Sequence, residues 1–430
     1  MADRLTDAAL VAYRAAGALV RPLVPVALAA RARRGKEDPA RRRERYGRAS
    51  LARPAGSLVW VHAASVGETN AVMPLLDRLS QSGFRILFTS TTVTSSRVAA
   101  ARLPQGAIHQ FGPVDVVAYV DRFLDHWHPD LAILVESELW PGSISRLHHR
   151  GIATIVVNAR LSARTFGGWS RVSAVARGLF ARIALVLAQS EEDAERFRRL
   201  GAANVRVTGN LKSDAPPLVA DPAELGRMRD AIGQRPVWVA ASTHEGEESI
   251  VAEVHRRLRD RFPDLLTVIV PRHPERGSAV RETLASRRLS VAQRSRGEPL
   301  LREVDVYLAD TLGELGLFYR LAPLAFLGGS LVPHGGQNPL EAVQLDAVVL
   351  HGPHVQNFSE VYGTLDAVRA SVRVTDAESL ASAVGALLAR PRSIADRAAA
   401  AASAVMPLAG ALDATMLALR PYLQGIVPAA

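Results

Sequence analysis

The sequence contains no cysteine among its 430 residues. Disulfide bonds and thiolate metal sites are therefore excluded, which is consistent with a reducing cytoplasmic setting. Aromatic residues are also scarce, at 5%, but apolar residues make up 48%, so the chain can bury cores for two ordinary domains. Charged residues account for 22%, an ordinary fraction for a globular protein, and extensive disorder is not expected.

Lysine is nearly absent as well, with two lysines, Lys36 and Lys212, against fifty arginines. A bias toward arginine codons accounts for the imbalance, but Lys212 could also mark a position that needs a compact, flexible point charge. The net charge of +10 is uneven, since residues 1–50 hold 12 basic and 5 acidic side chains, or +7 of the total. Because the basicity belongs to one end, the sequence does not predict a nucleic-acid-binding surface.

The apolar stretch near the amino terminus is not a clean membrane span. Residues 8–30 are mostly apolar, but Arg14, Arg21 and two prolines interrupt them, and a basic cluster follows at 31–36. A cleaved signal peptide fits poorly, because no small-residue cleavage site follows. The pattern favours a helix that lies in the lipid headgroup region with its arginines reaching phosphates. A tilted single span and a plain core helix of the first domain are the alternatives.

From residue 57 onward, short apolar runs alternate with amphipathic segments, which is typical of buried parallel strands covered by helices. The sequence predicts an α/β protein with an amino-terminal segment, two Rossmann-like domains and a linker in the proline-rich segment between them. The final helices could pack back on the first domain. The predicted boundaries are 1–34 for the segment, 35–214 and 223–430 for the domains, and 215–222 for the linker. The predicted strands are 57–63, 84–90, 130–136, 153–159, 185–190, 236–243, 265–273, 306–311, 324–330 and 347–353.

Ligands of open α/β sheets bind beyond the carboxyl ends of the strands, so the informative side chains are expected there, facing a cleft between the domains. The first predicted strand is followed by Ser65-Val66-Gly67-Glu68 and a helix. Glu68 either complements the helix dipole or takes a proton from a hydroxyl group in the cleft. The hydroxyl-rich run 89–96 after the next strand is interpreted as an N-cap and turn, in preference to a sugar-binding segment.

The third predicted strand ends in Glu136-Ser137-Glu138. Two acids two residues apart point the same way on an extended chain, and like charges so close raise one pKa unless a cation intervenes. Such an arrangement favours a functional site. Arg160, after the fourth strand, is a candidate partner for one of these acids. Lys212 lies near the end of the first domain, where it could reach an anion in the cleft.

In the second domain five segments follow strands or open helices, at 242–247, 271–276, 310–315, 328–330 and 334–341. Helix amides after residue 310 suit a phosphate, and Glu341 could hold ribose hydroxyls. Each motif is weak alone, but together they predict one nucleotide pocket. Metal coordination by His244, Glu245, His273 and His334 is the alternative. Their spacing matches no standard zinc pattern, and the chain has no Asp-x-Asp, so no metal cofactor is expected.

The motifs together resemble those of the bacterial 3-deoxy-D-manno-octulosonic acid (Kdo) transferases of lipopolysaccharide synthesis. They run in order from about residue 35 to 360: GKEDPARRRERYG, WVHAASVGE, ESELWP, NARLS, AQSEEDAERFRRLGA, TGNLKSD, STHEGEE, VPRHPER, DTLGELG, GGSLVPHGGQNPLE and GPHVQNF. The resemblance implies a GT-B fold and an inverting, metal-independent transfer of Kdo from CMP-Kdo. The implied acceptor is the 6′-hydroxyl of the lipid A precursor, lipid IVA, at the cytoplasmic face of the inner membrane of a Gram-negative cell.

By position, the resemblance implies that Glu68 is the proton acceptor and that Glu138 and Lys212 stabilise the transition state. The implied partners are CMP-Kdo, lipid IVA and, through the basic amino-terminal helix, inner-membrane lipids; no nucleic acid is expected. Gln337 stands where the family usually has histidine, and this departure touches none of the implied catalytic residues. The residues implied to bind CMP are Pro271, Arg272, Leu312, Gly313, Glu314, Asn338, Pro339, Leu340 and Glu341.

Three other functions are compatible with parts of the pattern. A GT-B glycosyltransferase that uses a UDP-sugar would bind UDP in preference to CMP. A non-catalytic glycolipid-binding module would transfer no sugar to lipid. A two-domain nucleotide-sugar epimerase would need neither a membrane anchor nor a lipid acceptor.

Overall fold

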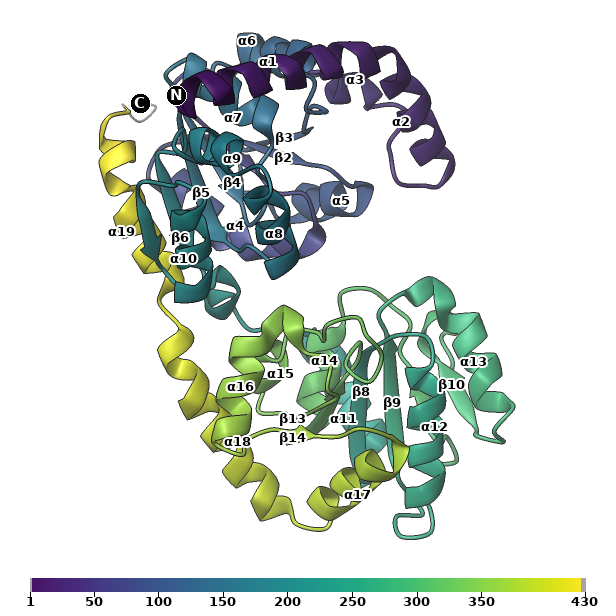
Figure 1. Cartoon of the computed structure of the whole chain (residues 1–430). Helices are drawn as coiled ribbons and strands as arrows, with labels where there is room; N and C mark the ends of the chain where they lie inside the picture. Colours follow the sequence, from purple (N-terminus) through teal and green to yellow (C-terminus); the bar gives the residue numbers. More distant parts are fainter. Residues whose placement is uncertain (1, 427–430) are drawn as a thin grey trace. The chain divides into compact units, whose positions relative to one another are not determined.

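The structure is a computed structural model, and it describes residues 2–426. The chain divides into two compact units, the first formed by residues 1–215 with 408–430 and the second by residues 216–407 (Figure 1). Within the described residues each unit contains one seven-stranded parallel sheet. The order is β3-β2-β1-β4-β5-β6-β7 in the first sheet and β10-β11-β9-β8-β12-β13-β14 in the second.

The first sheet contains β1 (Leu58–His62), β2 (Arg85–Ser90), β3 (Ile108–Phe111), β4 (Leu131–Val135), β5 (Ala153–Ala159), β6 (Leu185–Ala188) and β7 (Val205–Val207). The helices of this unit are α1 (Ala2–Val20), α2 (Val24–Arg33), α3 (Arg42–Arg45), α4 (Val66–Gln81), α5 (Val93–Arg102), α6 (Val117–Trp127), α7 (Pro141–His149), α8 (Ala163–Ser170), α9 (Ser173–Phe180), α10 (Glu191–Arg199) and α19 (Ala411–Gln424).

The second sheet contains β8 (Val237–Thr243), β9 (Leu266–Pro271), β10 (Val291–Gln293), β11 (Val306–Leu308), β12 (Leu324–Leu327), β13 (Val348–His351) and β14 (Val372–Arg373). Its helices are α11 (Pro222–Ile232), α12 (Glu247–Leu258), α13 (Gly277–Ala285), α14 (Leu315–Leu321), α15 (Leu340–Val343), α16 (Ser359–Ala367), α17 (Ala377–Leu388) and α18 (Pro391–Val405).

Both sheets are doubly wound, and each has a point where the strand order reverses. In the first sheet the order reverses between β1 and β4, and in the second between β8 and β12. Ligands of such sheets bind at the carboxyl ends of the strands on either side of this point. The residues that follow β1, β4, β8 and β12 are therefore the ones the fold places for binding or chemistry.

All ten predicted strands are present, and the four strands that the sequence did not predict are β3, β7, β10 and β14. These four are the edge strands of the two sheets. They are two to four residues long and only partly buried. A short edge strand has no continuous apolar run, because it is not covered on every side, and so it carries little pattern in the sequence.

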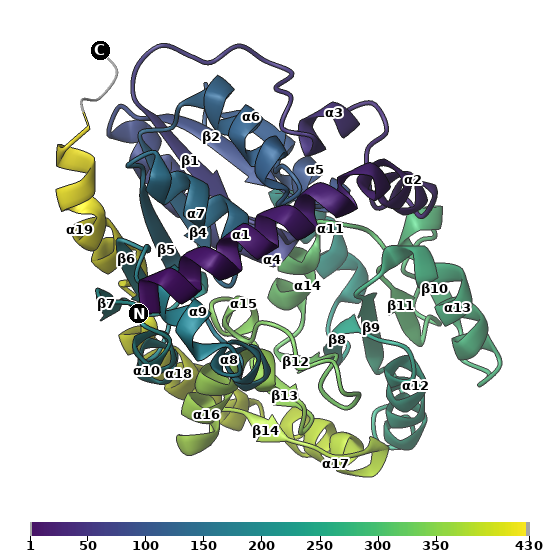
Figure 2. The same ribbon diagram turned by 45° about the horizontal axis from the view of Figure 1, so that its top comes forward.

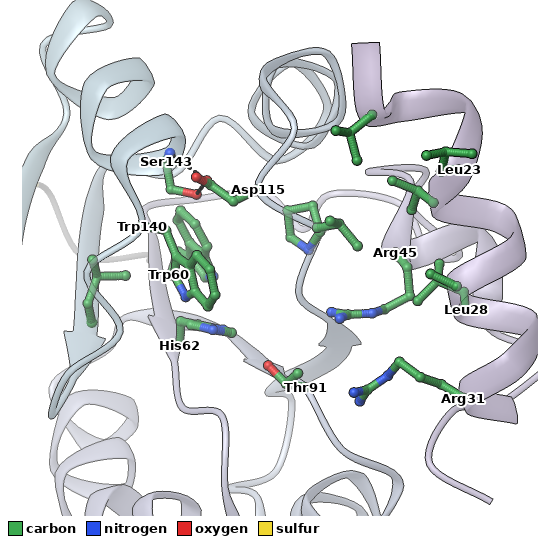
Figure 3. A pocket seen from close by; sticks show the side chains of 16 residues that line it. Leu23, Leu28, Arg31, Arg45, Trp60, His62, Thr91, Asp115, Trp140 and Ser143 are labelled. Atoms are coloured by element: carbon green, nitrogen blue, oxygen red, sulfur yellow. Dashed lines mark hydrogen bonds between the residues drawn. The ribbon is translucent and has the colours of Figure 1, made fainter. Parts of the chain in front are cut away.

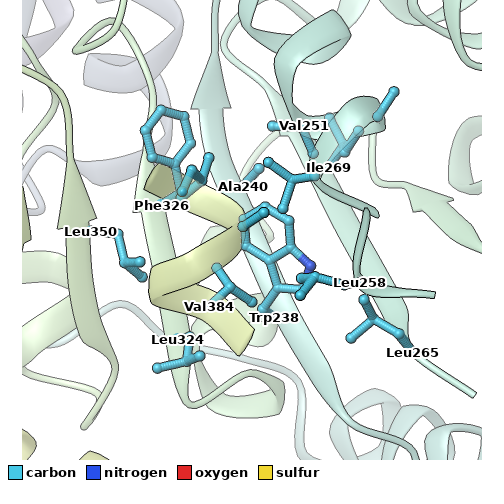
Figure 4. Packing of buried hydrophobic residues seen from close by; sticks show 14 of the residues in the cluster. Trp238, Ala240, Val251, Leu258, Leu265, Ile269, Leu324, Phe326, Leu350 and Val384 are labelled. Atoms are coloured by element: carbon cyan, nitrogen blue, oxygen red, sulfur yellow. The ribbon is translucent and has the colours of Figure 1, made fainter. Parts of the chain in front are cut away.

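The core of the second unit gathers around Trp238 of β8, which is fully buried. Val251 and Leu258 of α12 and Val384 of α17 belong to the same cluster (Figure 4). The indole N–H of Trp238 donates a hydrogen bond to Thr267 Oγ1 on β9 (2.8 Å), so its one polar atom is satisfied inside the core. A large rigid side chain at the centre of the sheet thus anchors helices from one face.

The amino-terminal helices α1 and α2 belong to the first unit. α1 packs against α9, α7 and α6, and Figures 1 and 2 show this arrangement from two directions. Thr6 is fully buried, and its hydroxyl donates to the Ala174 carbonyl (3.1 Å). Val24 and Leu28 of α2 are buried beside Tyr119 of α6. One side of this segment is therefore fixed to the domain.

The other side of the segment is apolar and exposed. Between 52% and 80% of the surface is accessible at Val11, Leu19, Val20, Leu23 and Val26. Within the described residues, 6–33 is one of two helical stretches that are long and apolar enough to cross a membrane, and 391–424 is the other. Arg21 lies over the Tyr119 ring, 5.7 Å from its centroid, so this arginine contacts the protein.

The last helix, α19, packs on the first unit although the segment before it belongs to the second. Leu419 and Leu423 join the core beneath the first sheet. Asp214 accepts a hydrogen bond from the Gly410 N–H (2.7 Å) just before the helix begins. The sequence left this packing open, and the structure assigns residues from 408 onward to the first unit.

Candidate active site

Glu68 lies at the start of α4, directly beyond the carboxyl end of β1. The Ser65 hydroxyl caps the helix by accepting from the Glu68 N–H (3.2 Å) and donates to Glu68 Oε1 (2.9 Å). The Ala64 N–H donates to Oε2 (2.7 Å). Through these contacts Glu68 helps to cap the amino terminus of α4. They also hold its carboxylate in one orientation, which a reacting group needs.

The pKa of the Glu68 carboxyl is raised above its ordinary value. The largest cause is burial, and the next is repulsion from the nearby Glu136 carboxylate. The hydrogen bonds from Ala64 and Ser65 act in the opposite direction, and Glu138 adds a smaller repulsion. A carboxylate with a raised pKa is a stronger base than an exposed one, so it is better suited to accept a proton from a hydroxyl group.

Glu138 follows β4 and is held by two aromatic side chains. His62 Nε2, at the end of β1, lies 3.3 Å from Glu138 Oε2, and the Trp140 indole N–H donates to the same oxygen (2.7 Å). Burial alone would raise the pKa of Glu138, but the contacts with His62 and Trp140 outweigh it and lower the pKa overall. Glu138 therefore keeps its negative charge more readily than Glu68 does.

The expectation that Glu136 and Glu138 point the same way along an extended chain is wrong. Glu136 adopts a left-handed backbone conformation (φ 55°), and the Glu138 N–H donates back to the Val135 carbonyl (3.3 Å). The two acids therefore sit in a turn, where each finds a different partner. Both still act on Glu68, because the charge of each raises its pKa.

Lys212 pairs with Glu136, which the sequence had not linked to it. Lys212 Nζ lies 2.7 Å from Glu136 Oε1. The segment that carries Lys212, η2 (Leu211–Asp214), is positioned by Asn158 at the end of β5, whose Oδ1 accepts from the Leu211 N–H (2.9 Å).

The Arg160 carbonyl accepts a hydrogen bond from the Ser137 hydroxyl. The proposed pairing of the Arg160 side chain with an acid stays a prediction.

Two site residues were missed from the sequence, namely His62 and Trp140. They lie within the motifs WVHAASVGE and ESELWP. Trp140 is only two residues from Glu138, whereas the contact of His62 with Glu138 depends on β1 and β4 being neighbours in the sheet. The interpretation of the hydroxyl-rich run as a helix start is confirmed. Thr92 is the N-cap of α5 and accepts from the Ser95 N–H (3.1 Å).

In the second unit six of the nine residues implied to bind CMP fall in two segments, 271–272 and 338–341, which lie close enough for the charge of Arg272 to act on Glu341. Asn338 Nδ2 donates to Glu341 Oε1 (3.3 Å). Burial raises the pKa of the Glu341 carboxyl, and the Asn338 hydrogen bond and the charge of Arg272 partly oppose this. Arg272 follows Pro271, the last residue of β9. Pro339 is the N-cap residue of α15, which begins at Leu340.

The remaining three of these residues form a second group after β11. Glu314 forms an ion pair with Arg294, and Arg294 Nε donates to its Oε2 (2.5 Å). This contact is the main reason why the pKa of Glu314 lies below its ordinary value. Leu312 is exposed, and Gly313 has a positive φ of 84° that favours glycine.

The histidines considered as metal ligands lie near each other. The rings of His244 and His334 are stacked, with centroids 4.2 Å apart, and His273 meets His244 edge-on. Burial, followed by the neighbouring positive groups, lowers the pKa of His244 to about 4. Among residues 2–426, no group of three histidine or acidic side chains is arranged to hold a metal ion.

Two doubly wound parallel α/β units, with acids beyond the first sheet and a polar cluster beyond the second, define the GT-B fold, to which many glycosyltransferases belong. A glycosyltransferase from Rickettsia africae has this fold, with a TM-score of 0.60 at 13% identity over 86% of this chain and 100% of that one. At that identity the likeness shows the fold alone.

The family follows from closer relatives. Residues 40–215 match the family model described as 3-deoxy-D-manno-octulosonic-acid transferase (kdotransferase). The 3-deoxy-D-manno-octulosonic acid transferase of Haemophilus influenzae is 37% identical over 389 residues, which cover 88% of this chain and 90% of the relative. A mitochondrial protein of Arabidopsis thaliana, described as a probable 3-deoxy-D-manno-octulosonic acid transferase, is 36% identical over 392 residues, which cover 88% of each chain. The chain belongs to the Kdo transferase family and is a glycosyltransferase, as predicted.

Proposed function

We propose that this enzyme transfers Kdo from CMP-Kdo to the 6′-hydroxyl of lipid IVA with inversion at the anomeric carbon. The observation that carries the proposal is the arrangement around Glu68. A carboxylate with a raised pKa, fixed by Ala64 and Ser65, lies near a second carboxylate that stays ionised and near a lysine–glutamate pair. The reaction requires a base that removes the proton of the acceptor hydroxyl and an anion that stabilises the positive sugar, and this arrangement provides both.

The chemistry of the sugar sets those needs. The anomeric carbon of Kdo is fully substituted and carries a carboxylate, so its transition state resembles an oxocarbenium ion. The bond from this carbon to the CMP phosphate oxygen breaks while the acceptor oxygen bonds to the opposite face. The acceptor hydroxyl loses its proton to Glu68, and CMP leaves with the electron pair of the broken bond.

Glu138 and Lys212 stabilise the charges that develop during this step. The negative charge of Glu138 stabilises the positive sugar, and the interactions with His62 and Trp140 keep that carboxylate ionised and oriented. The positive charge of Lys212 is held in place by Glu136 (2.7 Å) and favours the developing negative charge of the leaving group. The mechanism requires no metal ion.

The donor nucleotide binds to the second unit. The segments that contain Arg272, Glu314 and Asn338 to Glu341 offer one cation, amide groups and two carboxylates at the carboxyl ends of β9, β11 and β12. The cation and the amides suit the single phosphate of CMP, and the carboxylates suit ribose hydroxyls. This proposal includes all nine residues implied by the family motifs.

The amino-terminal helices hold the enzyme at the cytoplasmic face of the inner membrane. The exposed apolar side of α1 and α2 faces away from the domain, and Arg33, Arg34 and Lys36 at the end of α2 are exposed as well. An apolar helix face next to basic residues suits an anionic lipid surface. Deleting residues 1–30 and measuring how much protein pellets with membranes tests this; unchanged pelleting would refute it.

The activity itself is tested by incubating the enzyme with CMP-Kdo and the tetraacylated lipid A precursor and measuring the products by mass spectrometry. We expect lipid products whose mass is increased by one or more Kdo residues, with release of CMP. A UDP-sugar should give no product. Transfer from a UDP-sugar, or no transfer from CMP-Kdo, would contradict the proposal.

A further inference from the structure

The first unit contains a pocket whose lining includes none of the site residues predicted from the sequence. It lies between α2 and the carboxyl ends of β1 and β4 and has a volume of about 390 Å³. This size falls in the range of roughly 300–1,000 Å³ that is typical of small-molecule sites. Figure 3 shows Trp60 and Trp140 on one side of the pocket and Leu23 and Leu28 of the amino-terminal helices on the other.

The lining of the pocket is mostly apolar. Ten of its sixteen residues have apolar side chains. Of the polar ones, Asp115 is fully engaged, because it accepts from the N–H groups of Gly142 and Ser143 (2.8 and 2.7 Å), from the Ser143 hydroxyl (2.6 Å) and from Tyr13 (2.8 Å). A carboxylate with this many donors does not demand a polar ligand.

The pocket adjoins the predicted catalytic carboxylates. Two of its lining residues, His62 and Trp140, are the partners of Glu138, at 3.3 and 2.7 Å. Glu138 is in turn close enough to Glu68 for its charge to raise the pKa of Glu68. A ligand in the pocket therefore lies beside the place where the acceptor hydroxyl must react.

The pocket is also continuous with the exposed apolar side of the amino-terminal helices. Val20 and Leu23 line the pocket, yet they are 52% and 62% exposed. Val20 and Leu23 thus give an apolar chain a continuous apolar contact from the outer surface of the helix to the pocket, which Arg31 and Arg45 also line. The rim carries Arg31, which is 42% exposed and paired with Glu37 (2.8 Å), so a positive charge stands near the entrance.

We propose that this pocket receives one acyl chain of the acceptor glycolipid and thereby positions its sugar at Glu68. The inference rests on the proposed function, because it requires an acylated acceptor. A long saturated chain fits an apolar pocket that opens on an apolar surface, and an anionic glycolipid fits the arginine at the rim. The acceptor is favoured over bulk phospholipid because the pocket leads to the reacting groups and not merely to the membrane.

The first test fills the pocket and compares two acceptors. Leu28→Trp places a larger side chain at the α2 wall of the pocket, and Val26→Trp is the matched control on the exposed side of the same helix. With the tetraacylated acceptor, Leu28→Trp should raise KM at least 10-fold, whereas Val26→Trp should not. With the fully deacylated, water-soluble disaccharide, Leu28→Trp and the wild type should behave alike.

Equal KM values for Leu28→Trp and the wild type on the tetraacylated acceptor would overturn the pocket assignment and leave the proposed function intact. An equal loss on both acceptors would also overturn it, because the damage would not depend on the acyl chains. If the wild type transferred Kdo to neither acceptor, the proposed function itself would fail.

The second test uses the unaltered enzyme, so it does not depend on how the variant folds. An acceptor that carries a diazirine at the end of an acyl chain is photolysed with the enzyme, and the adducts are mapped by mass spectrometry. We expect adducts on peptides that contain Trp60, Leu134 or Trp140. A phosphatidylethanolamine with the same diazirine should label only the outer helix face. Pocket adducts from the phospholipid alone, or acceptor adducts confined to Val11 and Leu19, would contradict the proposal.

Discussion

Lys212 Nζ and Glu136 Oε1 lie 2.7 Å apart, although the two residues are 76 positions apart in the sequence. This ion pair brings the second lysine of the chain next to a group of three acids, Glu68, Glu136 and Glu138. The charges in this group influence each other, because Glu136 and Glu138 both raise the pKa of Glu68. The ionisation of Glu68 therefore depends on the charges of two neighbouring acids.

Replacing Glu136 should shift the pH dependence of the enzyme. In Glu136→Gln the negative charge that helps to raise the pKa of Glu68 is lost, so that pKa should fall. The basic form of Glu68 would then persist to lower pH, and the acidic limb of the kcat/KM profile should move to lower pH.

The control for this prediction is Glu191→Gln, which neutralises an exposed acid at the start of α10. Its pH profile should match that of the wild type. An acidic limb that stays in place in Glu136→Gln, or moves to higher pH, would show that Glu68 does not set it.

Removing the indole donor of Trp140 should slow turnover. Trp140→Phe keeps an aromatic ring but deletes the N–H that donates to Glu138 Oε2 (2.7 Å). The pKa of Glu138 should rise, since this hydrogen bond is one of the interactions that lower it. A hydrogen bond to a charged group contributes about 1.5–3 kcal/mol, so kcat should fall by roughly 10- to 150-fold. Unchanged kcat with a raised KM would indicate a binding role instead.

The Glu341 carboxyl should reduce stability at neutral pH. Burial raises its pKa above the ordinary value of 4.5, so its protonated form is favoured in the folded state. The stability it contributes is present below the unfolded pKa and is lost as pH rises through the folded pKa. Glu341→Gln should therefore gain stability relative to the wild type as pH rises above 4.5, while its affinity for CMP falls.

Urea unfolding at several pH values, together with CMP titration, measures both effects. The free energy of unfolding of the variant should exceed that of the wild type more at pH 7 than at pH 4. A difference that is constant with pH would mean that Glu341 ionises normally. Unchanged CMP affinity would remove it from the nucleotide site.

The docking of α1 on α9 can be tested at Gly178. A Cβ atom at this position would lie 2.0 Å from Thr6 Oγ1 and 2.5 Å from Thr6 Cβ, so Gly178→Ala must displace α1. Overpacking of this kind costs about 1–3 kcal/mol. We expect a lower midpoint in urea unfolding and faster proteolysis within the first thirty residues.

The matched control is Gly167→Ala in α8, where a Cβ atom would meet nothing within 4 Å. Because alanine is the better helix former, this change should be neutral or stabilise by about 0.5–1 kcal/mol. If Gly178→Ala behaved like Gly167→Ala, α1 would not be fixed to the first unit.

Much of the fold and part of the site follow from the sequence. Buried strands such as 57–63 and 236–243 are continuous apolar runs, so they are predictable, whereas the edge strands β7 and β14 are two or three residues long and partly exposed. Glu68 was placed correctly near the start of a helix because it follows a strand and a glycine, and the structure adds that Ser65 is the N-cap of α4.

The contacts between distant residues could not be predicted. Glu136 was expected on an extended chain, but its left-handed backbone turns it toward Lys212. His62 reaches Glu138 only because β1 and β4 are neighbours, which no local pattern reveals. The amino-terminal helix was interpreted from its composition as a membrane-surface helix. The wall it contributes to the pocket depends on Val24 and Leu28 packing against α6, and that packing is a tertiary contact.

The proton-accepting role of Glu68 is tested most directly by the turnover of Glu68→Gln with saturating CMP-Kdo and tetraacylated acceptor. The amide is nearly the same size as the carboxylate but cannot accept the proton of the acceptor hydroxyl. We predict that kcat falls on the order of 100-fold or more, while CMP affinity stays at the wild-type value. A Glu68→Gln enzyme with near-normal kcat would contradict the account.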